Sequence, residues 1–296
     1  MDLSILVPVY NFTVVEFVTE LQSQARESGC TFEILCFDDF SEDTFKNENK
    51  KVVAIKNVFY MELPENLGRS KIRNLLAEKA KGEYLLFFDC DSQIISNDFI
   101  LNYLHHKEPG KIIFGGRAYS ELPPEEEKKI LHWKFGSSRE CIPPRFRKLK
   151  PYKLFMTNNF LIPQNIFLSI KMNEEIIGYG HEDTAFAREL KKRKIQIIHI
   201  DNPLLHIGLE DAELFLKKSK QGISNLSKLI KNNLIDGEVK VFGYYQLVKK
   251  YYLEKPLRAF LNAFGRLFEK NLLSKNPRLV YFDLLKLKWL MEEMEK

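Results

Sequence analysis

The first 120 residues alternate between two hydrophobic patterns, and this alternation limits the possible folds more than any other feature. Short, almost wholly apolar runs occupy residues 3–9, 32–37, 52–61, 84–88 and 112–115. Such runs are typical of strands that are buried on both faces. Between them, residues 14–21 and 69–81 repeat apolar side chains at helical spacing. The alternation predicts an α/β fold with a mainly parallel sheet and helices on both faces.

Residues 121–153 interrupt this alternation. Two proline pairs, at 123–124 and 143–144, bound a basic stretch that also contains Trp133. We expect a helix followed by a long loop that acts as a lid. Regular structure should resume at residues 154–162, with a helix at 182–193 and a strand at 195–200. Beyond about residue 212 only helical spacing remains, so we expect an α/β domain over residues 1–212 and a helical region over residues 213–296.

Composition excludes several classes of protein. Of the 296 residues, 45% are hydrophobic and 29% are charged, as is usual for a globular chain with a real core. The longest apolar runs fall far short of the roughly 20 residues that a membrane-spanning helix needs. The N-terminus lacks the pattern of a signal peptide. The four cysteines have no metal-site spacing and are too few for a disulfide scaffold, so we expect a reducing cytoplasm.

Charge is distributed unevenly along the chain. Residues 217–290 hold 16 basic and 5 acidic residues, although the whole chain has a net charge of only +5. A basic, aromatic-rich helix can lie on the inner face of an anionic membrane as a peripheral attachment. The same aromatic side chains could instead pack onto the rest of the protein. They are Tyr244, Tyr245, Tyr251, Tyr252, Phe260, Phe264 and Phe268.

Polar residues follow each of the first four predicted strands. A single carboxylate after a strand is usually a helix cap. The carboxyl ends of parallel strands, however, meet at one edge of a sheet, where ligands bind. Four polar ends at that edge therefore predict a nucleotide site. The ends read Pro8-Val9-Tyr10-Asn11, Asp38-Asp39-Phe40-Ser41, Asn66-Leu67-Gly68-Arg69 and Asp89-Cys90-Asp91.

Three further features suggest chemistry. Asp89 and Asp91 face the same side of an extended chain, and carboxylates so placed suit Mg²⁺ or Mn²⁺ carrying a phosphorylated substrate; turn-forming aspartates are the alternative. Glu182 and Asp183 follow a glycine-rich turn and open a helix, where the helix dipole alone could explain them. His206 is a lone histidine, and such residues are more often structural than ligands.

Together these motifs resemble the inverting glycosyltransferases of family 2, which have the GT-A fold, a Rossmann-like sheet flanked by helices. The resemblance covers about residues 2–212 and includes the four strand ends, Ile72-Arg73-Asn74, the Glu182-Asp183 pair and His206. Two departures are Phe40, where the family usually has glycine, and Ile72, where it often has alanine. The first lies in the loop expected near the base.

The resemblance implies a role for each motif. The nucleotide would be held by Pro8, Val9, Tyr10, Asp39, Gly68, Arg69 and Asp89, with Asp39 on the base and Asp89 on the ribose. Asp91 and His206 would bind a divalent cation, Mn²⁺ or Mg²⁺. Asp183 would be the catalytic base, and Glu182 would orient the acceptor or support the base. Asn158 is a weaker candidate for contact with sugar or acceptor hydroxyls, and a turn role is the alternative. Apart from the resemblance, Arg145 and Arg147 of the predicted lid would suit an acidic or phosphate-bearing acceptor.

The reaction so implied is transfer of a sugar from a nucleotide-diphospho-sugar, a UDP-sugar by default, to a hydroxyl of a glycan or lipid-linked acceptor in surface polysaccharide synthesis. Alternatives are a non-catalytic nucleotide-sugar-binding module and a sugar nucleotidyltransferase, although residues 6–14 lack the glycine and lysine of a phosphate loop. A haloacid-dehalogenase phosphatase is a further alternative, because such enzymes also have an apolar strand that ends in Asp-x-Asp. They usually have Thr or Val at the position that Gln93 occupies here. Nucleic-acid binding by the basic region lacks any recognised module.

Overall fold

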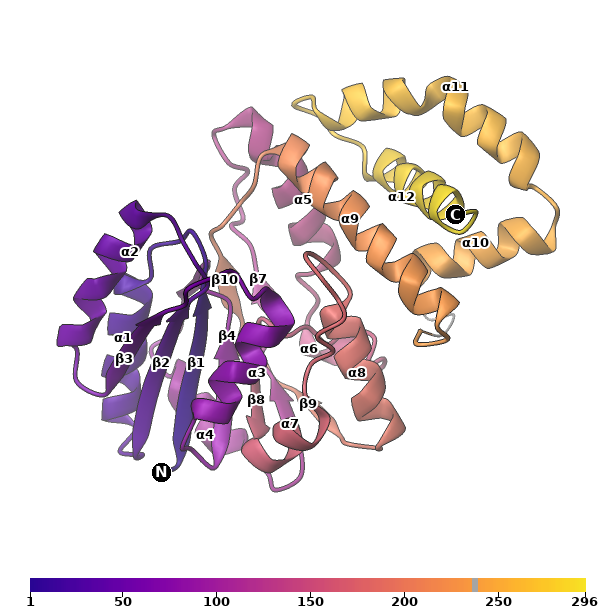
Figure 1. The fold of residues 1–296 in the computed structure, drawn as a ribbon. Helices are drawn as coiled ribbons and strands as arrows, with labels where there is room; N and C mark the ends of the chain where they lie inside the picture. The colour runs from indigo at the N-terminus through magenta and orange to yellow at the C-terminus, as the bar shows by residue number, and fades with distance from the viewer. Residues whose placement is uncertain (236–238) are drawn as a thin grey trace. The chain divides into compact units, whose positions relative to one another are not determined.

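The computed structural model describes residues 1–235 and 239–296, which form two compact units (Figure 1). Unit 1 comprises Met1–Tyr119, Cys141–Glu175 and Glu182–Gly208, and unit 2 comprises Ser120–Glu140, Ile176–His181 and Leu209–Lys296. The two units interleave along the chain. A domain boundary at residues 212 and 213 stays a prediction.

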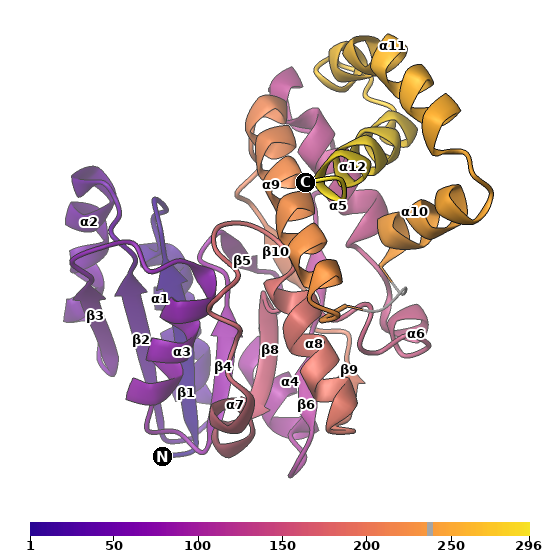
Figure 2. The ribbon, with the colours of Figure 1, turned by 45° about the vertical axis from the view of Figure 1, so that its right-hand side comes forward.

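Unit 1 is built on a seven-stranded sheet of order β3-β2-β1-β4-β8-β6-β9. Its strands are β1 (Leu3–Val9), β2 (Phe32–Asp38), β3 (Val58–Glu62), β4 (Tyr84–Phe88), β6 (Ile112–Phe114), β8 (Asn159–Pro163) and β9 (Ile197–His199). Only β8 runs antiparallel to its neighbours, and Figure 2 shows the strands side by side. The mainly parallel sheet is confirmed.

Helices cover both faces of this sheet. Side chains alternate along β1, so Ile5 and Val7 enter one hydrophobic core while Leu6 enters another. The first core includes residues of α1 (Val15–Glu27) and α4 (Phe99–His106). The second includes residues of α3 (Arg69–Lys79), α7 (Gln164–Ile170) and α8 (Glu182–Lys192). A further helix of unit 1, α2 (Asp43–Asn49), precedes a short 3₁₀ helix at Lys50–Ala54.

Two predicted segments have wrong bounds. The strand expected at residues 52–61 begins only at Val58, because Lys50–Ala54 forms a 3₁₀ turn that buries Val52 and leaves Val53 60% exposed. A short apolar run does not distinguish these two structures. Residues 154–158 form turns and loop, so the regular structure expected at 154–162 begins at Asn159, as strand β8. The strand expected at 195–200 is confirmed as β9.

The insertion at residues 121–153 is shared between the units. Its predicted helix is confirmed as a 3₁₀ turn (Glu127–Lys129) followed by α5 (Ile130–Arg139) in unit 2. The expected loop contains a further short helix, α6 (Pro144–Arg147), which belongs to unit 1. Whether this segment acts as a lid stays a prediction.

Unit 2 is helical, as predicted for the region beyond residue 212. Its long helices are α9 (Ala212–Lys231), α10 (Lys240–Lys250), α11 (Glu254–Leu272) and α12 (Leu279–Glu293). Helices α9, α10 and α11 each contact α12 around a separate core that includes Leu226, Leu261 and Leu290. Within the described part of the chain, no helix is both long and apolar enough to cross a membrane.

Candidate active site

A second, three-stranded sheet in unit 1 gathers residues that lie far apart in the sequence. It consists of β5 (Ser92–Ile94), β10 (Leu204–His206) and β7 (Arg117–Ala118), in that order. His206 pairs with Ser92, and Leu204 pairs with Arg117. The Ile207 amide donates to the carbonyl of Asp91 at 2.9 Å. The pairing therefore brings Asp91, Arg117 and His206 together.

Asp91 lies beside two nitrogen-bearing side chains. Its Oδ1 is 3.3 Å from His206 Nδ1 and 3.9 Å from Arg117 Nη2. Burial raises the pKa of Asp91, but the charges of His206 and Arg117 outweigh burial and hold this pKa below its usual value. The Oδ1 atom is buried and makes no well-formed hydrogen bond to the described residues. Gly208 packs so tightly here that a Cβ atom would lie 2.6 Å from that of Asp91.

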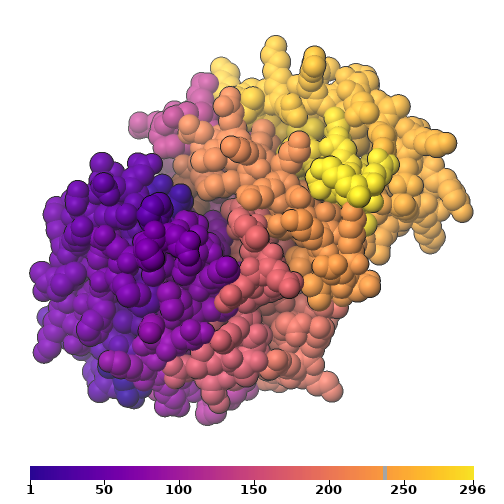
Figure 3. All heavy atoms as spheres, viewed as in Figure 1, coloured from indigo at the N-terminus to yellow at the C-terminus, as the bar shows by residue number. Residues whose placement is uncertain are grey.

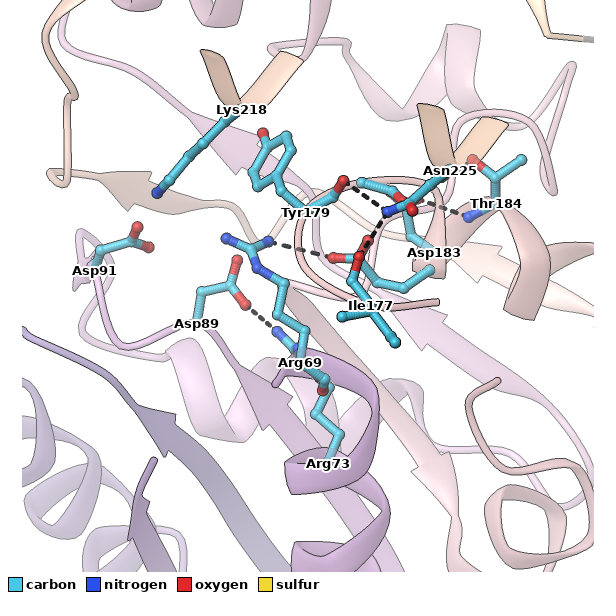
Figure 4. Close-up of polar contacts among 12 residues, drawn as sticks. Arg69, Arg73, Asp89, Asp91, Ile177, Tyr179, Asp183, Thr184, Lys218 and Asn225 are labelled. Atoms are coloured by element: carbon cyan, nitrogen blue, oxygen red, sulfur yellow. Dashed lines mark hydrogen bonds and ion pairs between the residues drawn. The ribbon is translucent and has the colours of Figure 1, made fainter. Parts of the chain in front are cut away.

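Asp89 is held between two arginines at the end of β4. Arg73 of α3 donates to Oδ1 (Figure 4), and Arg117 Nη2 donates to Oδ2 at 3.4 Å. The Asp89 amide donates to the carbonyl of Asn158 at 3.1 Å. Sequence reasoning missed Arg117, which no motif marks, although the pairing of its strand makes it the common neighbour of Asp89, Asp91 and His206.

Asp39 joins two of the predicted nucleotide-binding loops. Its carboxylate accepts hydrogen bonds from the Leu67 amide at 2.7 Å and the Gly68 amide at 2.9 Å. Burial raises the pKa of Asp39, and the two amides oppose that rise. Gly68 has a φ of 80° directly before α3, a conformation that favours glycine. These bonds fix the loop, and the predicted contact of Asp39 with a base stays a prediction.

The three predicted nucleotide-binding residues at the end of β1 differ in their exposure to solvent. Pro8 is partly buried, Val9 is buried in the core, and Tyr10 is 53% exposed. The Val9 carbonyl accepts a hydrogen bond from the Asp39 amide at 2.7 Å. The side chain of Tyr10 is therefore accessible to a ligand, whereas that of Val9 is not.

Glu182 and Asp183 occupy the first turn of α8 with different surroundings, and Asp183 is labelled in Figure 4. Arg69 donates to Glu182 Oε1 at 3.2 Å, and the other carboxylate oxygen is buried with no hydrogen bond to the described residues. Burial raises the pKa of Glu182, but the positive charges of Arg69 and Arg73 hold it below its usual value. Asp183 is only half-buried and accepts a hydrogen bond from the Thr184 amide at 2.7 Å.

Asn158 is a buried residue directly before β8, and its carbonyl accepts the hydrogen bond from the Asp89 amide. It is 4% exposed, and neither its side-chain oxygen nor its nitrogen has a hydrogen-bond partner among the described residues. An unpaired buried polar group costs about 1–3 kcal/mol. The side-chain amide of Asn158 and Glu182 Oε2 therefore supply unsatisfied polar atoms that a polar ligand would pair.

Arg147 is not placed to contact an acceptor, so this prediction is wrong. It is 2% exposed, and its guanidinium donates to the carbonyls of Gly115 at 3.0 Å and Ile200 at 2.8 Å. The guanidinium of Arg147 therefore binds backbone carbonyls that follow β6 and β9. Arg145 is exposed and stacks over Phe146, with 4.9 Å to the ring centroid, and its acceptor role stays a prediction.

The predicted cation ligands can form only part of a metal site. Among the described residues, no three His, Cys, Asp or Glu side chains surround one point. Mg²⁺ is commonly bound by one or two carboxylates together with substrate phosphates and water. Asp91 and His206 fit such a set, because the buried Asp91 Oδ1 has capacity for a further contact. Burial raises the pKa of Cys90 to about 12, so its thiol is protonated at neutral pH.

Comparison with known proteins decides the family. The protein-family model described as glycosyl transferase family 2 matches residues 4–177 of this sequence, which is more than half of the chain. The chain belongs to glycosyltransferase family 2. This confirms the predicted family and, with it, the class of enzyme, a glycosyltransferase.

Solved structures similar to this family member share its fold. The mannosyltransferase PcManGT from Pyrobaculum calidifontis, in complex with GDP-Man and Mn²⁺, has a TM-score of 0.58 and 12% identity, covering 99% of this chain and 85% of that one. S. aureus TarS 1–349 in complex with UDP-GlcNAc has a TM-score of 0.52 and 16% identity, covering 100% and 91%. The GT-A fold is thereby confirmed.

A curated relative is the poly(ribitol-phosphate) beta-glucosyltransferase of Bacillus spizizenii. It is 36% identical over 114 residues, which are 36% of this chain and 18% of the relative. The chain spans 45% and 66% of two other glycosyltransferases that it matches, from Haemophilus influenzae and Bacillus subtilis.

Proposed function

We propose that this family 2 member is a metal-dependent, inverting glycosyltransferase that moves a sugar from a nucleotide-diphospho-sugar to a hydroxyl group. The observation that carries the proposal is the arrangement in unit 1 of Asp89, Asp91 and His206 at adjoining strand ends, with acidic residues at the first turn of α8. The structures similar in fold were solved with UDP-GlcNAc and with GDP-Man and Mn²⁺, which supports a nucleotide-sugar donor. We take a UDP-sugar as the default donor.

In this mechanism the strand ends bind the donor. Asp89, fixed by Arg73 and Arg117, would accept hydrogen bonds from the ribose hydroxyls. Asp91 and His206 would hold the divalent cation, which supplies positive charge to the departing diphosphate. An aspartate carboxylate is ionised at neutral pH, as a metal ligand must be.

The first turn of α8 serves the acceptor. A hydroxyl is a weak nucleophile, and Asp183 would take its proton as it attacks the anomeric carbon. Glu182 is enclosed and paired with Arg69, so it orients this turn rather than accepting the proton. Asn158 would pair its unsatisfied amide with a sugar or acceptor hydroxyl. Attack on the face opposite the diphosphate inverts the anomeric centre.

We propose a surface polysaccharide or its lipid-linked precursor as the acceptor. The relative from Bacillus spizizenii is named for transfer to poly(ribitol-phosphate), an anionic polymer, which supports an acceptor of this class. The cytoplasmic location stays a prediction, as does the acceptor contact of Arg145.

Donor turnover tests the proposal against a non-catalytic binding module. The protein is incubated with Mn²⁺ and a series of UDP-, GDP- and dTDP-sugars, and release of nucleoside diphosphate is measured with and without acceptor glycans. We expect one sugar nucleotide to be turned over, more slowly to water than to acceptor. Binding of a nucleotide sugar without any release would favour the binding module, and formation of a sugar nucleotide from a sugar phosphate would favour a nucleotidyltransferase.

A further inference from the structure

Helix α11 of unit 2, labelled in Figure 1, has two apolar faces. Only one of them is buried. The buried face contacts α12 through residues spaced at helical intervals, Leu261, Gly265, Phe268 and Leu272. The neighbouring face exposes Phe260, Phe264 and Leu267 by 44%, 43% and 60%. The predicted aromatic set is thereby divided, because Phe268 packs in the core whereas Phe260 and Phe264 meet solvent.

The exposed face continues into the turn that precedes α11. Tyr251, Tyr252 and Leu253 are 61%, 91% and 49% exposed. We call these six residues, 251–253 with Phe260, Phe264 and Leu267, the α11 surface. In Figure 3 the golden atoms of this segment lie at the surface of unit 2. Contiguous exposed apolar groups on this scale mark an interaction site more often than isolated ones do.

Basic residues border the α11 surface. At about 100° per residue, Lys255, Arg266 and Lys270 fall on the side of the apolar stripe that faces away from the core, and all three are exposed. At the end of α10, Lys250 is exposed and lies over the Tyr251 ring at 5.6 Å from its centroid. The surface therefore combines apolar side chains with a positive margin.

We propose that the α11 surface docks on an anionic lipid bilayer. Helices that lie in the membrane interface place Phe and Leu on one face and Lys and Arg beside it, and tyrosine rings favour the headgroup level. Anionic headgroups complement the basic margin. A second copy of the chain fits less well, because a two-fold contact would place the same lysines and arginines against each other.

The proposal is independent of the transferase reaction, and vesicle sedimentation of the full chain without donor tests it. The vesicles are phosphatidylcholine alone or phosphatidylcholine with phosphatidylserine, at low and high salt. We expect binding to the anionic vesicles only, weakened by salt. Replacing Phe260, Phe264 and Leu267 by Ser should reduce this binding at least about tenfold, and so should reversing Lys255, Arg266 and Lys270 to Glu.

Matched controls replace exposed apolar residues elsewhere. Phe59→Ser and Leu149→Ser, at side chains that are 53% and 76% exposed, should leave vesicle binding unchanged. Unaltered thermal unfolding and metal-dependent nucleotide binding would show that each variant is folded. The proposal is overturned if the wild-type protein ignores anionic vesicles at low salt, if the controls lose as much binding as the α11 variants, or if the α11 variants only abolish a dimer seen by light scattering.

Discussion

Arg117 connects most of the groups in the candidate site. Its Nη2 atom lies within 4 Å of carboxylate oxygens of Asp89 and Asp91 and within 3.2 Å of His206 Nδ1. A guanidinium in this position balances two neighbouring carboxylates before any ligand arrives. Sequence analysis could not identify it, because β7 is two residues long and its pairing with β10 depends on residues far along the chain.

Arg117→Ala should weaken donor binding more than it slows turnover. Without the guanidinium, the Asp89 carboxylate loses one of its two arginine partners, and the negative charges of Asp89 and Asp91 repel each other. Loss of a hydrogen bond to a charged group costs about 1.5–3 kcal/mol. We expect the donor KM to rise about tenfold or more with a smaller change in kcat. Steady-state kinetics measure this, with the exposed Arg145→Ala as the control. Equal effects of the two variants on the donor KM would refute the role of Arg117.

Asp183→Asn should leave donor binding intact and reduce transfer. The substitution keeps the shape and removes the proton acceptor, so kcat should fall by about 10²-fold or more. A loss below about tenfold would assign the base elsewhere. The sugar product, examined by NMR, should have the opposite anomeric configuration to the donor, and retention would exclude the mechanism.

At the scale of elements, helix α9 holds the loop that leads into the acidic pair. Asn225 of α9 donates to the carbonyls of Ile177 at 3.0 Å and Tyr179 at 3.1 Å (Figure 4). Gly178 and Gly180 have positive φ, and a Cβ atom on Gly180 would lie 3.0 Å from the backbone Cα of Gly222 in α9. These glycines are therefore required by the turn and by its close approach to α9.

Asn225→Ala should lower kcat and leave nucleotide affinity unchanged. Without the amide, the carbonyls of the loop lose their partner, and the chain that enters Glu182 and Asp183 becomes less ordered. We expect a loss of about tenfold in kcat, with a partial recovery in Asn225→Gln. The exposed Lys220→Ala on the same helix serves as the control. A rise in the dissociation constant for nucleoside diphosphate as large as the fall in kcat would indicate general destabilisation instead.

The sequence predicted long elements better than short ones. Helices α3 and α8 and strands β1, β2 and β4 carry enough periodic residues to be recognised, whereas β5, β7 and β10 have two or three residues each. Those three strands nevertheless position Asp91, Arg117 and His206. The residue types of the site were predictable from motifs, but the ion pairs that orient them depend on strand pairing, which no local pattern encodes.

At the scale of the whole molecule, two units share an interleaved chain. A single boundary near residue 212 was expected, because no strand pattern follows that position in the sequence. Residues 120–140 and 176–181 also belong to the helical unit, and neither the short helix of the first segment nor the glycine-rich turn of the second shows in the sequence which core it joins. The burial of Arg147 could not be predicted from the sequence either, because a basic residue in a proline-bounded segment is usually exposed.

Stability should fall in weak acid because of a buried histidine. His199 donates from Nε2 to the Pro151 carbonyl, and its Nδ1 lies 3.4 Å from Arg147 Nη1, which fits a neutral ring. Burial, together with the charge of Arg147, lowers the pKa of His199 to about 4. The folded pKa is below the unfolded value, so this contribution is complete above about pH 6.5 and is lost as the pH falls toward 4.

Urea unfolding at about pH 7.5 and about pH 5 measures this loss, which we expect to be about 2 kcal/mol from His199. His199→Gln can both donate and accept but does not titrate, so its stability should fall by about 2 kcal/mol less over the same interval. Equal losses in the two proteins would contradict the assignment.

Metal-dependent nucleotide binding tests the central claim most directly. Isothermal titration calorimetry of UDP, GDP and dTDP, with Mn²⁺ and with EDTA, compares the wild-type protein with Asp91→Ala. We predict that one nucleotide binds the wild-type protein tightly only with Mn²⁺, and that Asp91→Ala removes the metal-dependent part while unfolding at a similar temperature. Undiminished metal-dependent binding by Asp91→Ala, or equal wild-type binding in EDTA, would contradict the account.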